Sequence, residues 1–170
     1  MYQIVRDPAS GFYHFQTAKG LTYICRFQGC TNQLSPVLGV YDIEIYEFDF
    51  TCYSPQPFNR ELPSKDDRVS ATIVHLLSQF FSHELRVIVY LCDSIDGRHK
   101  VRHRLFEHWH RLYAQHYLMR LPVDIEWEDE NVTAAAHGCV IIRNDFPHLD
   151  VLKHELINNA FEIITEKYGY

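Results

Sequence analysis

The segment that most constrains the fold is residues 87–92, VIVYLC, because it is apolar at almost every position. Strands of this kind are buried on both faces and lie inside a sheet, whereas half-exposed strands alternate apolar and polar residues. Apolar residues recur at helical spacing on either side of it, from about residue 66 to 83 and from about 97 to 119. The sequence therefore predicts a central strand with helices packed against it.

The segments before the central strand are typical of antiparallel strands joined by turns. Residues 11–27 predict a hairpin that turns at Ala18–Gly20, and residues 28–39 predict a loop rich in helix- and strand-breaking residues. A third strand is predicted at residues 40–52. The Pro-rich stretch 53–65 predicts a connection that is long enough to serve as a lid or a mobile cover.

The third predicted strand has apolar residues of both parities. Ile43 and Ile45 share one parity, whereas Tyr46, Phe48 and Phe50 share the other. Because side chains alternate between the two faces of a strand, one set would lie on the wrong face of a half-exposed sheet. A bulge near Ile45 and Tyr46, or burial of both faces, would reconcile the two sets.

Capping and breaking residues set the limits of the two predicted helices that flank the central strand. Asp66 or Asp67 can cap the free amides at the start of the first helix. The second helix runs from about Gly97 to Met119, and Pro122 prevents it from continuing.

Two strands, at residues 123–127 and 134–142, and a helix that starts near Pro147 complete the predicted elements. The predicted order is βββ-α-β-α-ββ-α. Because strands and helices do not alternate strictly, this order predicts the α+β class, with a mixed, largely antiparallel twisted sheet of about six strands and three helices. The length of 170 residues suits a single domain, 1–170.

Charge and cysteine content exclude several classes of protein. The net charge of −6 opposes binding to nucleic acid and to anionic membranes. No apolar run approaches the ~18 residues of a membrane span, and the N-terminus lacks a signal-peptide pattern, so we expect a cytoplasmic location. The five cysteines include no CxxC pair, which favours reduced thiols over a disulfide framework or a zinc site.

The turn at residues 92–97, CDSIDG, is the place where we expect a site. It follows the most buried strand and precedes a helix, and ligands often meet exposed backbone amides at such positions. Asp93 and Asp96 have the residue type needed to hold a metal or to act as acid and base. The alternative is structural: Asp96 or Ser94 caps the helix, and Asp93 pairs with an arginine.

The helix after this turn has arginines on its apolar side. At about 100° per residue, Arg98 and Arg102 fall within the apolar stripe, and an inward arginine is costly unless it is paired. The stripe consists of Val101, Leu105, Trp109 and Leu112, continued by Phe106, Tyr113 and Tyr117, and the opposite side carries Lys100, Arg104, Glu107 and Arg111. Either the arginines pair with nearby aspartates in a structural network, or they line a pocket for a phosphate or carboxylate. The candidate ligand-binding residues are Asp93, Asp96, Arg98, Arg102, Asp67 and Arg68.

The familiar metal and cofactor motifs are incomplete or missing. His99, His103 and His110 share one edge of the helix but lack an identifiable third zinc ligand. The HE pair at residues 154–155 resembles the start of a zinc-protease motif, yet Asn158 stands where the second His is needed. The sequence has no P-loop, GxGxxG, GxSxG or acetyl-CoA-type glycine loop. We therefore expect no metal, no cofactor and no catalytic residues.

Three runs of residues resemble one family. They are Asp67-Arg68-x-x-x-Thr72-Ile73, Tyr90-x-Cys92-Asp93-x-x-Asp96-Gly97-Arg98 and Arg102-x-Arg104-Leu105-Phe106-x-x-Trp109. With the aromatic hairpin and the Tyr-rich third strand, they resemble a family of small bacterial proteins of unknown function, chiefly from Bacteroidetes, over about the first two thirds of the chain. The resemblance implies a bacterial cytoplasmic protein and transfers no catalytic residues.

These observations favour a non-enzymatic binding or protein-interaction module. The opposite charges of residues 98–111 and 124–130 would suit a homodimer or another protein partner. The alternative is a small enzyme or ligand-binding protein that recognises an anionic small molecule at the 92–97 turn. A third hypothesis is nucleic-acid binding through the basic helix, which the overall acidity of the chain opposes.

Overall fold

The computed structural model describes residues 1–30, 36–54, 66–82, 85–92, 99–129 and 132–168. Its strands are β1 (Val5–Arg6), β2 (Tyr13–Gln16), β3 (Thr22–Gly29), β4 (Glu44–Tyr53), β5 (Arg86–Cys92), β6 (Leu118–Asp129) and β7 (Val132–Arg143). Its helices are α1 (Pro36–Val40), α2 (Asp67–Phe80), α3 (His99–Trp109), the π-helical turn η2 (His110–Ala114) and α4 (Leu149–Tyr168). The mixed α+β class is confirmed, and these described residues add one strand and one helix to the prediction.

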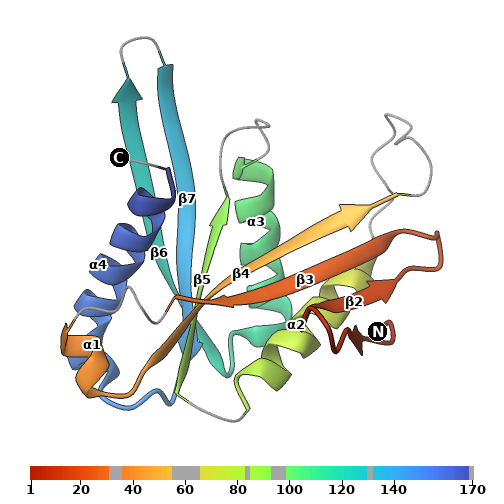
Figure 1. The fold of residues 1–170 in the computed structure, drawn as a ribbon, viewed down its shortest axis with the longest axis horizontal. Coiled ribbons are helices and arrows are strands. Elements are labelled where there is room, and N and C mark those ends of the chain that lie inside the picture. Colours follow the sequence, from red (N-terminus) through yellow and green to blue (C-terminus); the bar gives the residue numbers. More distant parts are fainter. Residues whose placement is uncertain (31–35, 55–65, 83–84, 93–98, 130–131, 169–170) are drawn as a thin grey trace.

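Within the described residues, seven strands form one sheet in the order β1-β2-β3-β4-β5-β7-β6. Neighbouring strands are antiparallel except β4 and β5, which run parallel in the middle of the sheet. Helices α2 and α3 pack on one face, and α1 and α4 pack on the other. Figure 1 shows α1 and α4 beside the β6–β7 part of the sheet, and α2 crossing β3.

Strand β5 separates two hydrophobic cores. Ile88, Tyr90 and Cys92 pack towards α2 and α3, whereas Val87 and Val89 pack towards α1 and α4. All five side chains are buried. The prediction of a central strand covered on both faces is therefore confirmed, and burial of apolar area on both sides stabilises it.

Strand β4 and the residue before it contribute to both cores. Ile43 and Ile45 pack with α1 and α4, whereas Phe48 belongs to the opposite core and Phe50 packs against it. The pairing of β4 with β3 runs in one unbroken register. Of the two explanations for the mixed parity, burial of both faces is therefore correct, and the predicted bulge is absent from β4.

Helix α2 begins where the sequence predicts. The Asp66 carboxylate caps it by accepting a hydrogen bond from the Arg68 backbone N–H at 3.0 Å, and it also accepts one from the Tyr2 hydroxyl at 2.7 Å. The Tyr2 backbone N–H donates to Thr72 Oγ1 at 2.8 Å, which ties the N-terminal segment to the helix. The bond from Tyr2 is the main reason why the pKa of Asp66 lies below its ordinary value.

Helix α3 is shorter than predicted. It ends at Trp109 and continues only as η2 to Ala114, and Leu118 already begins β6, so Met119 lies in a strand. Pro122, which was expected to stop the helix, lies inside β6. This strand is the last in the sheet order, and an edge strand tolerates a residue without a backbone N–H. Pairing along the whole length of β7 overrides the helical pattern of these residues.

The remaining elements agree with the prediction except in two short segments. The hairpin of β2 and β3 is confirmed, with Gly20 at φ +78° in its turn. Helix α1 forms in the predicted 28–39 loop because Leu38 is fully buried beneath α4. Strand β1 was not predicted. Most of the 53–65 connection lies outside the described residues.

The C-terminal part follows the predicted order. The strands expected at 123–127 and 134–142 lie within β6 and β7, and α4 begins shortly after Pro147. No described helix has both the length and the hydropathy that a membrane span requires.

Candidate functional site

The two parallel strands in the middle of the sheet separate towards their carboxyl ends. Their backbones pair from Glu44 opposite Arg86 to Glu47 opposite Val89. Beyond this point β4 continues beside β3, β5 continues beside β7 to Cys92, and no further pairing joins β4 and β5 among the described residues. Figure 1 shows the two arrows pointing apart. The carboxyl ends of parallel strands are where open sheets most often bind ligands.

A cavity of about 250 Å³ opens in this gap, and we call it the wedge. Residues 47–51 of β4 and 90–92 of β5 form its walls, and Arg26, Arg102 and Phe106 complete the lining. Binding pockets for drug-sized molecules span about 300–1,000 Å³. The wedge therefore suits a small ligand or one end of a longer ligand.

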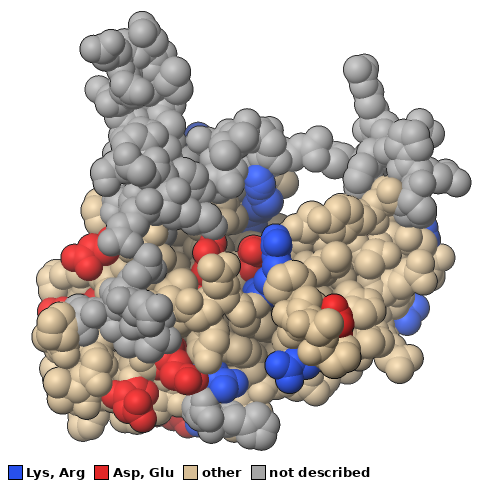
Figure 2. Space-filling view, viewed as in Figure 1, with Lys and Arg blue, Asp and Glu red and all other residues tan. Residues whose placement is uncertain are grey.

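The wedge carries charges of both signs. Arg26 Nη2 lies 2.8 Å from Asp49 Oδ1, and both side chains of this pair are partly exposed. Arg102 and Glu47 are half-buried residues of the same lining. Figure 2 shows acidic and basic side chains next to one another in the middle of the molecule. Because the two arginines and two carboxylates balance, the described lining suits a ligand with an anionic group and hydrogen-bond donors better than a dianion.

An aromatic cluster forms the apolar side of the wedge. The rings of Tyr90 and Phe106 are stacked, with centroids 4.3 Å apart, and Phe50 meets Phe106 at 5.6 Å. Stacked and edge-on rings of this kind are rigid because each ring restricts its neighbours. The polar groups of the wedge therefore lie next to a rigid, closely packed set of aromatic side chains.

A buried polar group lies behind Tyr90. Arg120 of β6 donates a hydrogen bond to the Tyr90 hydroxyl at 2.7 Å, and its Nε has no hydrogen-bond partner among the described residues. Cys139 of β7 lies directly opposite Tyr90 in the sheet. Burial raises the pKa of the Tyr90 hydroxyl and of the Cys139 thiol. Both groups therefore stay neutral at neutral pH, and Cys139 lacks the thiolate character of a nucleophile.

Among the predicted site residues, Arg102 lies in the wedge. Asp93, Asp96 and Arg98 lie outside the described residues. Arg102 is half-buried, in agreement with its predicted inward direction. The choice between a pocket and an ion-pair network remains a prediction for Arg102 as well as for Asp93, Asp96 and Arg98.

The other two predicted residues lie elsewhere. Asp67 is the first residue of α2 and lines a separate groove beside α3. The Arg68 guanidinium lies over the Tyr2 ring, 4.1 Å from its centroid, and donates to the backbone carbonyl of Met1 at 3.2 Å. Asp67 and Arg68 therefore do not belong to the wedge, because the start of α2 is on a different part of the surface.

The apolar stripe predicted on α3 is rotated in the structure. Phe106 and Trp109 are buried as expected, but Val101 and Leu112 are 65% and 52% exposed. The aromatic side chains bury more area and so determine which face meets the sheet. Lys100, Arg104, Glu107 and Arg111 are exposed, as the projection predicted.

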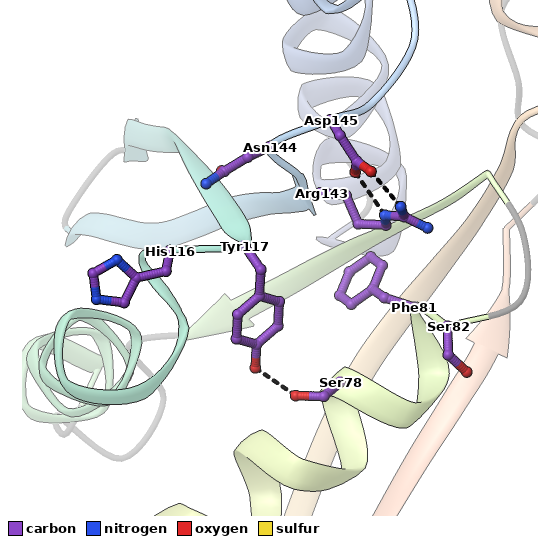
Figure 3. A pocket seen from close by; sticks show the side chains of 8 residues that line it. All are labelled: Ser78, Phe81, Ser82, His116, Tyr117, Arg143, Asn144 and Asp145. Atoms are coloured by element: carbon purple, nitrogen blue, oxygen red, sulfur yellow. Dashed lines mark hydrogen bonds and ion pairs between the residues drawn. The ribbon is translucent and has the colours of Figure 1, made fainter.

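A larger recess of about 550 Å³ lies at the opposite end of the sheet, and Figure 3 shows its lining. The Tyr117 and Ser78 hydroxyls form a hydrogen bond, and Ser78 also donates to the Val74 carbonyl at 2.8 Å. Arg143 pairs with Asp145 and lowers the pKa of that carboxyl. The recess lies away from the carboxyl ends of the parallel strands, where open sheets most often bind ligands, and it is therefore the weaker candidate for a binding site.

Two of the histidines of α3 and η2 contact other elements. His110 Nε2 lies 2.7 Å from the Leu118 carbonyl oxygen, and the rings of His103 and His137 are 5.2 Å apart. In the part of the chain that the structure describes, no three His, Cys, Asp or Glu side chains gather as metal ligands would.

Sequence reasoning missed three charged residues of the wedge: Arg26, Glu47 and Asp49. The charge pair follows from the β3–β4 register, which sets Arg26 opposite Asp49. The sequence gives no short turn between these strands from which the register could be deduced. Glu47 is the last residue of β4 that pairs with β5, and only the separation of the strands makes it part of a cavity.

The comparisons with known proteins identify a family but no activity. No curated protein and no solved structure matches the chain significantly. A family model matches residues 65–162, from the start of α2 into α4. The expected membership of a family of unknown function is thus confirmed over residues 65–162, which include the C-terminal hairpin, whereas the resemblance of the residues before 65 and the bacterial source stay predictions. Because this match spans more than half of its length, the chain belongs to the family described as Family of unknown function (DUF6169).

Proposed function

We propose that this protein is a binding module whose ligand enters the wedge as an extended, amide-bearing chain that ends in an anionic group. The observation that carries the proposal is the separation of β4 and β5 over a cavity at their carboxyl ends. The proposal retains the anionic group expected from the sequence. Of the residues expected to bind it at and after the 92–97 turn, the proposal uses Arg102.

The strand edges define the backbone of the ligand. Where β4 and β5 are paired, each supplies hydrogen-bonding groups to the other, and beyond Val89 an inserted chain would take over that role. Extended peptides bind exposed strand edges in this manner, and main-chain hydrogen bonds supply the affinity. A ligand with amides spaced along a linear chain meets this requirement, whereas a compact sugar or base does not.

The side chains define the two ends of the ligand. Arg102 offers a guanidinium for a carboxylate, and Glu47 and Asp49 accept hydrogen bonds from amide or ammonium groups. The aromatic side of the wedge, with Tyr90 and Phe106, accommodates an apolar portion. This combination favours a short peptide with a free carboxylate over inorganic phosphate.

Calorimetric titration tests the proposal with N-acetyl-trialanine and with its C-terminal amide. We expect measurable binding of the free acid, and about tenfold weaker binding after Arg102→Gln, because a hydrogen bond to a charged group contributes ~1.5–3 kcal/mol. Arg104→Gln is the matched control, since Arg104 is exposed on the same helix and outside the wedge. Equal effects of the two substitutions would contradict the assignment.

A second probe separates the possible sources of the amide-bearing chain. Pantetheine has a linear chain with secondary amides but no carboxylate. Binding of pantetheine that does not depend on Arg102 would support the extended-chain mode and reject the carboxylate. If neither probe binds, or if a probe binds in the recess around Tyr117 and not in the wedge, the wedge is rejected as the site.

A further inference from the structure

The outer surface of α3 carries an apolar row that the fold leaves exposed. Val101, Leu105 and Leu112 are 65%, 38% and 52% exposed. Val101 and Leu105 are one turn apart on α3, and Leu112 lies in η2, which continues the helix. Single exposed apolar residues are ordinary, but aligned ones on a helix are typical of interaction surfaces.

A basic row runs beside this apolar row. Lys100, Arg104 and Arg111 are exposed and lie on the adjoining side of the helix. No ion pair joins these three side chains to a carboxylate in the described part of the chain. These three cations outnumber Glu107, the exposed carboxylate on the same side, so the surface is locally positive although the whole chain has a net charge of −6.

A groove lies on the other side of the apolar row. It has a volume of about 220 Å³ and is formed by α3, the start of α2 and the β2–β3 turn. Leu105 and Trp109 line it from α3. The other elements contribute apolar side chains (Leu21, Tyr23 and Val69) and charged ones (Lys19, Asp66 and Asp67). The groove provides space into which a partner can insert an apolar side chain next to the exposed row.

We propose that this surface of α3 docks an acidic amphipathic segment of another protein. The apolar face of the segment would cover Val101, Leu105 and Leu112 and insert one large side chain into the groove. Its carboxylates would meet Lys100 and Arg104. Amphipathic helices bind grooves in this way, and complementary charge fixes their orientation.

Other occupants fit this surface less well. A nucleic acid would use the basic row but would leave the apolar row in water. A second copy that met this one through α3 on both sides would bring two copies of the same positive row to one interface, because a two-fold contact uses the same surface of both copies. A membrane presents a broad surface and no single side chain that would fill the groove.

Selection from a phage-displayed library of random 16-residue peptides against the full chain tests this proposal. We expect the selected peptides to be acidic and amphipathic. Val101→Ser should weaken their binding about tenfold, as burial of a valine side chain implies. Selection of basic or non-amphipathic peptides, or of none, would overturn the proposal.

Two matched variants on α4 serve as controls. Val151→Ser alters a valine that is 62% exposed, and Lys153→Glu alters an exposed lysine. Both control variants should leave peptide binding unchanged. Arg104→Glu should weaken peptide binding, and a peptide with Lys in place of Glu should bind that variant again. The four substituted positions, Val101, Arg104, Val151 and Lys153, are exposed, so their variants should keep the melting temperature of the natural protein. A measured melting temperature therefore distinguishes loss of binding from loss of folding.

The same protein is then tested with the rejected occupants. Light scattering measures self-association, sedimentation with phosphatidylserine vesicles measures membrane binding, and retention of duplex DNA at low salt measures nucleic-acid binding. If Val101→Ser weakens binding in one of these assays and leaves peptide binding unchanged, the surface binds the occupant measured in that assay. Our proposal of an acidic peptide segment is then rejected. The wedge is not involved in these measurements, so they are independent of the proposed function.

Discussion

Replacement of Tyr90 by Phe removes a hydrogen-bond partner of the half-buried Arg120 without changing the shape of the core. The Tyr90 side chain is 1% exposed, and its ring stacks on Phe106 in either variant. Its hydroxyl accepts a hydrogen bond from Arg120 at 2.7 Å. A hydrogen bond to a charged group contributes ~1.5–3 kcal/mol to the free energy of unfolding. We therefore expect Tyr90→Phe to lower that free energy by about 2 kcal/mol, and the melting temperature by about 4–8 °C.

A double-mutant cycle in urea measures whether this loss comes from Arg120. In an Arg120→Met background the hydroxyl has no charged partner, and we expect Tyr90→Phe to cost less than ~0.5 kcal/mol there. Arg120→Met alone should lower the free energy of unfolding less than Tyr90→Phe does, since it removes the half-buried charge together with its need for a partner. A cost of Tyr90→Phe that is the same in both backgrounds, or near zero in the natural sequence, would refute the reasoning.

Three further predictions concern stability. Asp66→Ala should lower the free energy of unfolding by ~1 kcal/mol through loss of the α2 cap. Because the pKa of Asp66 is lowered in the folded protein, its contribution to stability should be present above about pH 4 and disappear as pH falls further. Urea titrations at several pH values measure this dependence. Burial raises the pKa of Cys25 to about 12, so above about pH 9 the folded thiol keeps a proton that the unfolded thiol loses. The free energy of unfolding should therefore fall as pH rises above about 9, and Cys25→Ala should make this fall with pH less steep. Phe106→Ala should cost ~3–5 kcal/mol because the ring is buried, whereas Leu112→Ala at an exposed position should stay within ~0.5 kcal/mol, and equal costs would mean that the buried face of α3 is assigned wrongly.

The central part of the fold is readable from the sequence because burial leaves a pattern. Strand β5 is apolar on both faces, and the mixed parity of β4 required either a bulge or two buried faces. Asp66 identified the start of α2 because a capping side chain acts within a single turn of the helix. Each of these signals depends on residues that are close together in the chain.

The errors arise where distant segments compete with local preference. Residues up to Met119 have helical spacing, yet β6 pairs with β7 from Leu118 onward, and many cross-strand bonds outweigh a local propensity. Pro122 was read as a helix stop because the sequence does not show that β6 is an edge strand. Helix α1 forms inside a predicted loop because Leu38 finds a buried place beneath α4.

The candidate site was predictable only in its location. The sequence pointed to the carboxyl end of the buried strand and to Arg102, which lines the wedge. It did not reveal that β4 separates from β5, because the end of a parallel pairing leaves no periodic signal. Arg26 and Asp49 are paired because of the register between β3 and β4, which are joined by a long connection. This register could not be deduced from the sequence, so the two residues were not predicted to line the site.

The most direct test of the wedge is a backbone NMR titration of the isotope-labelled chain with N-acetyl-trialanine. If the peptide enters as an extended chain between β4 and β5, amide signals of Phe48 to Thr51 and of Tyr90 and Leu91 should shift together and saturate, and those of α4 should not move. Signals that shift only around Tyr117 and Asn144, or that do not shift at all, would contradict the claim that the separated strands form the binding site.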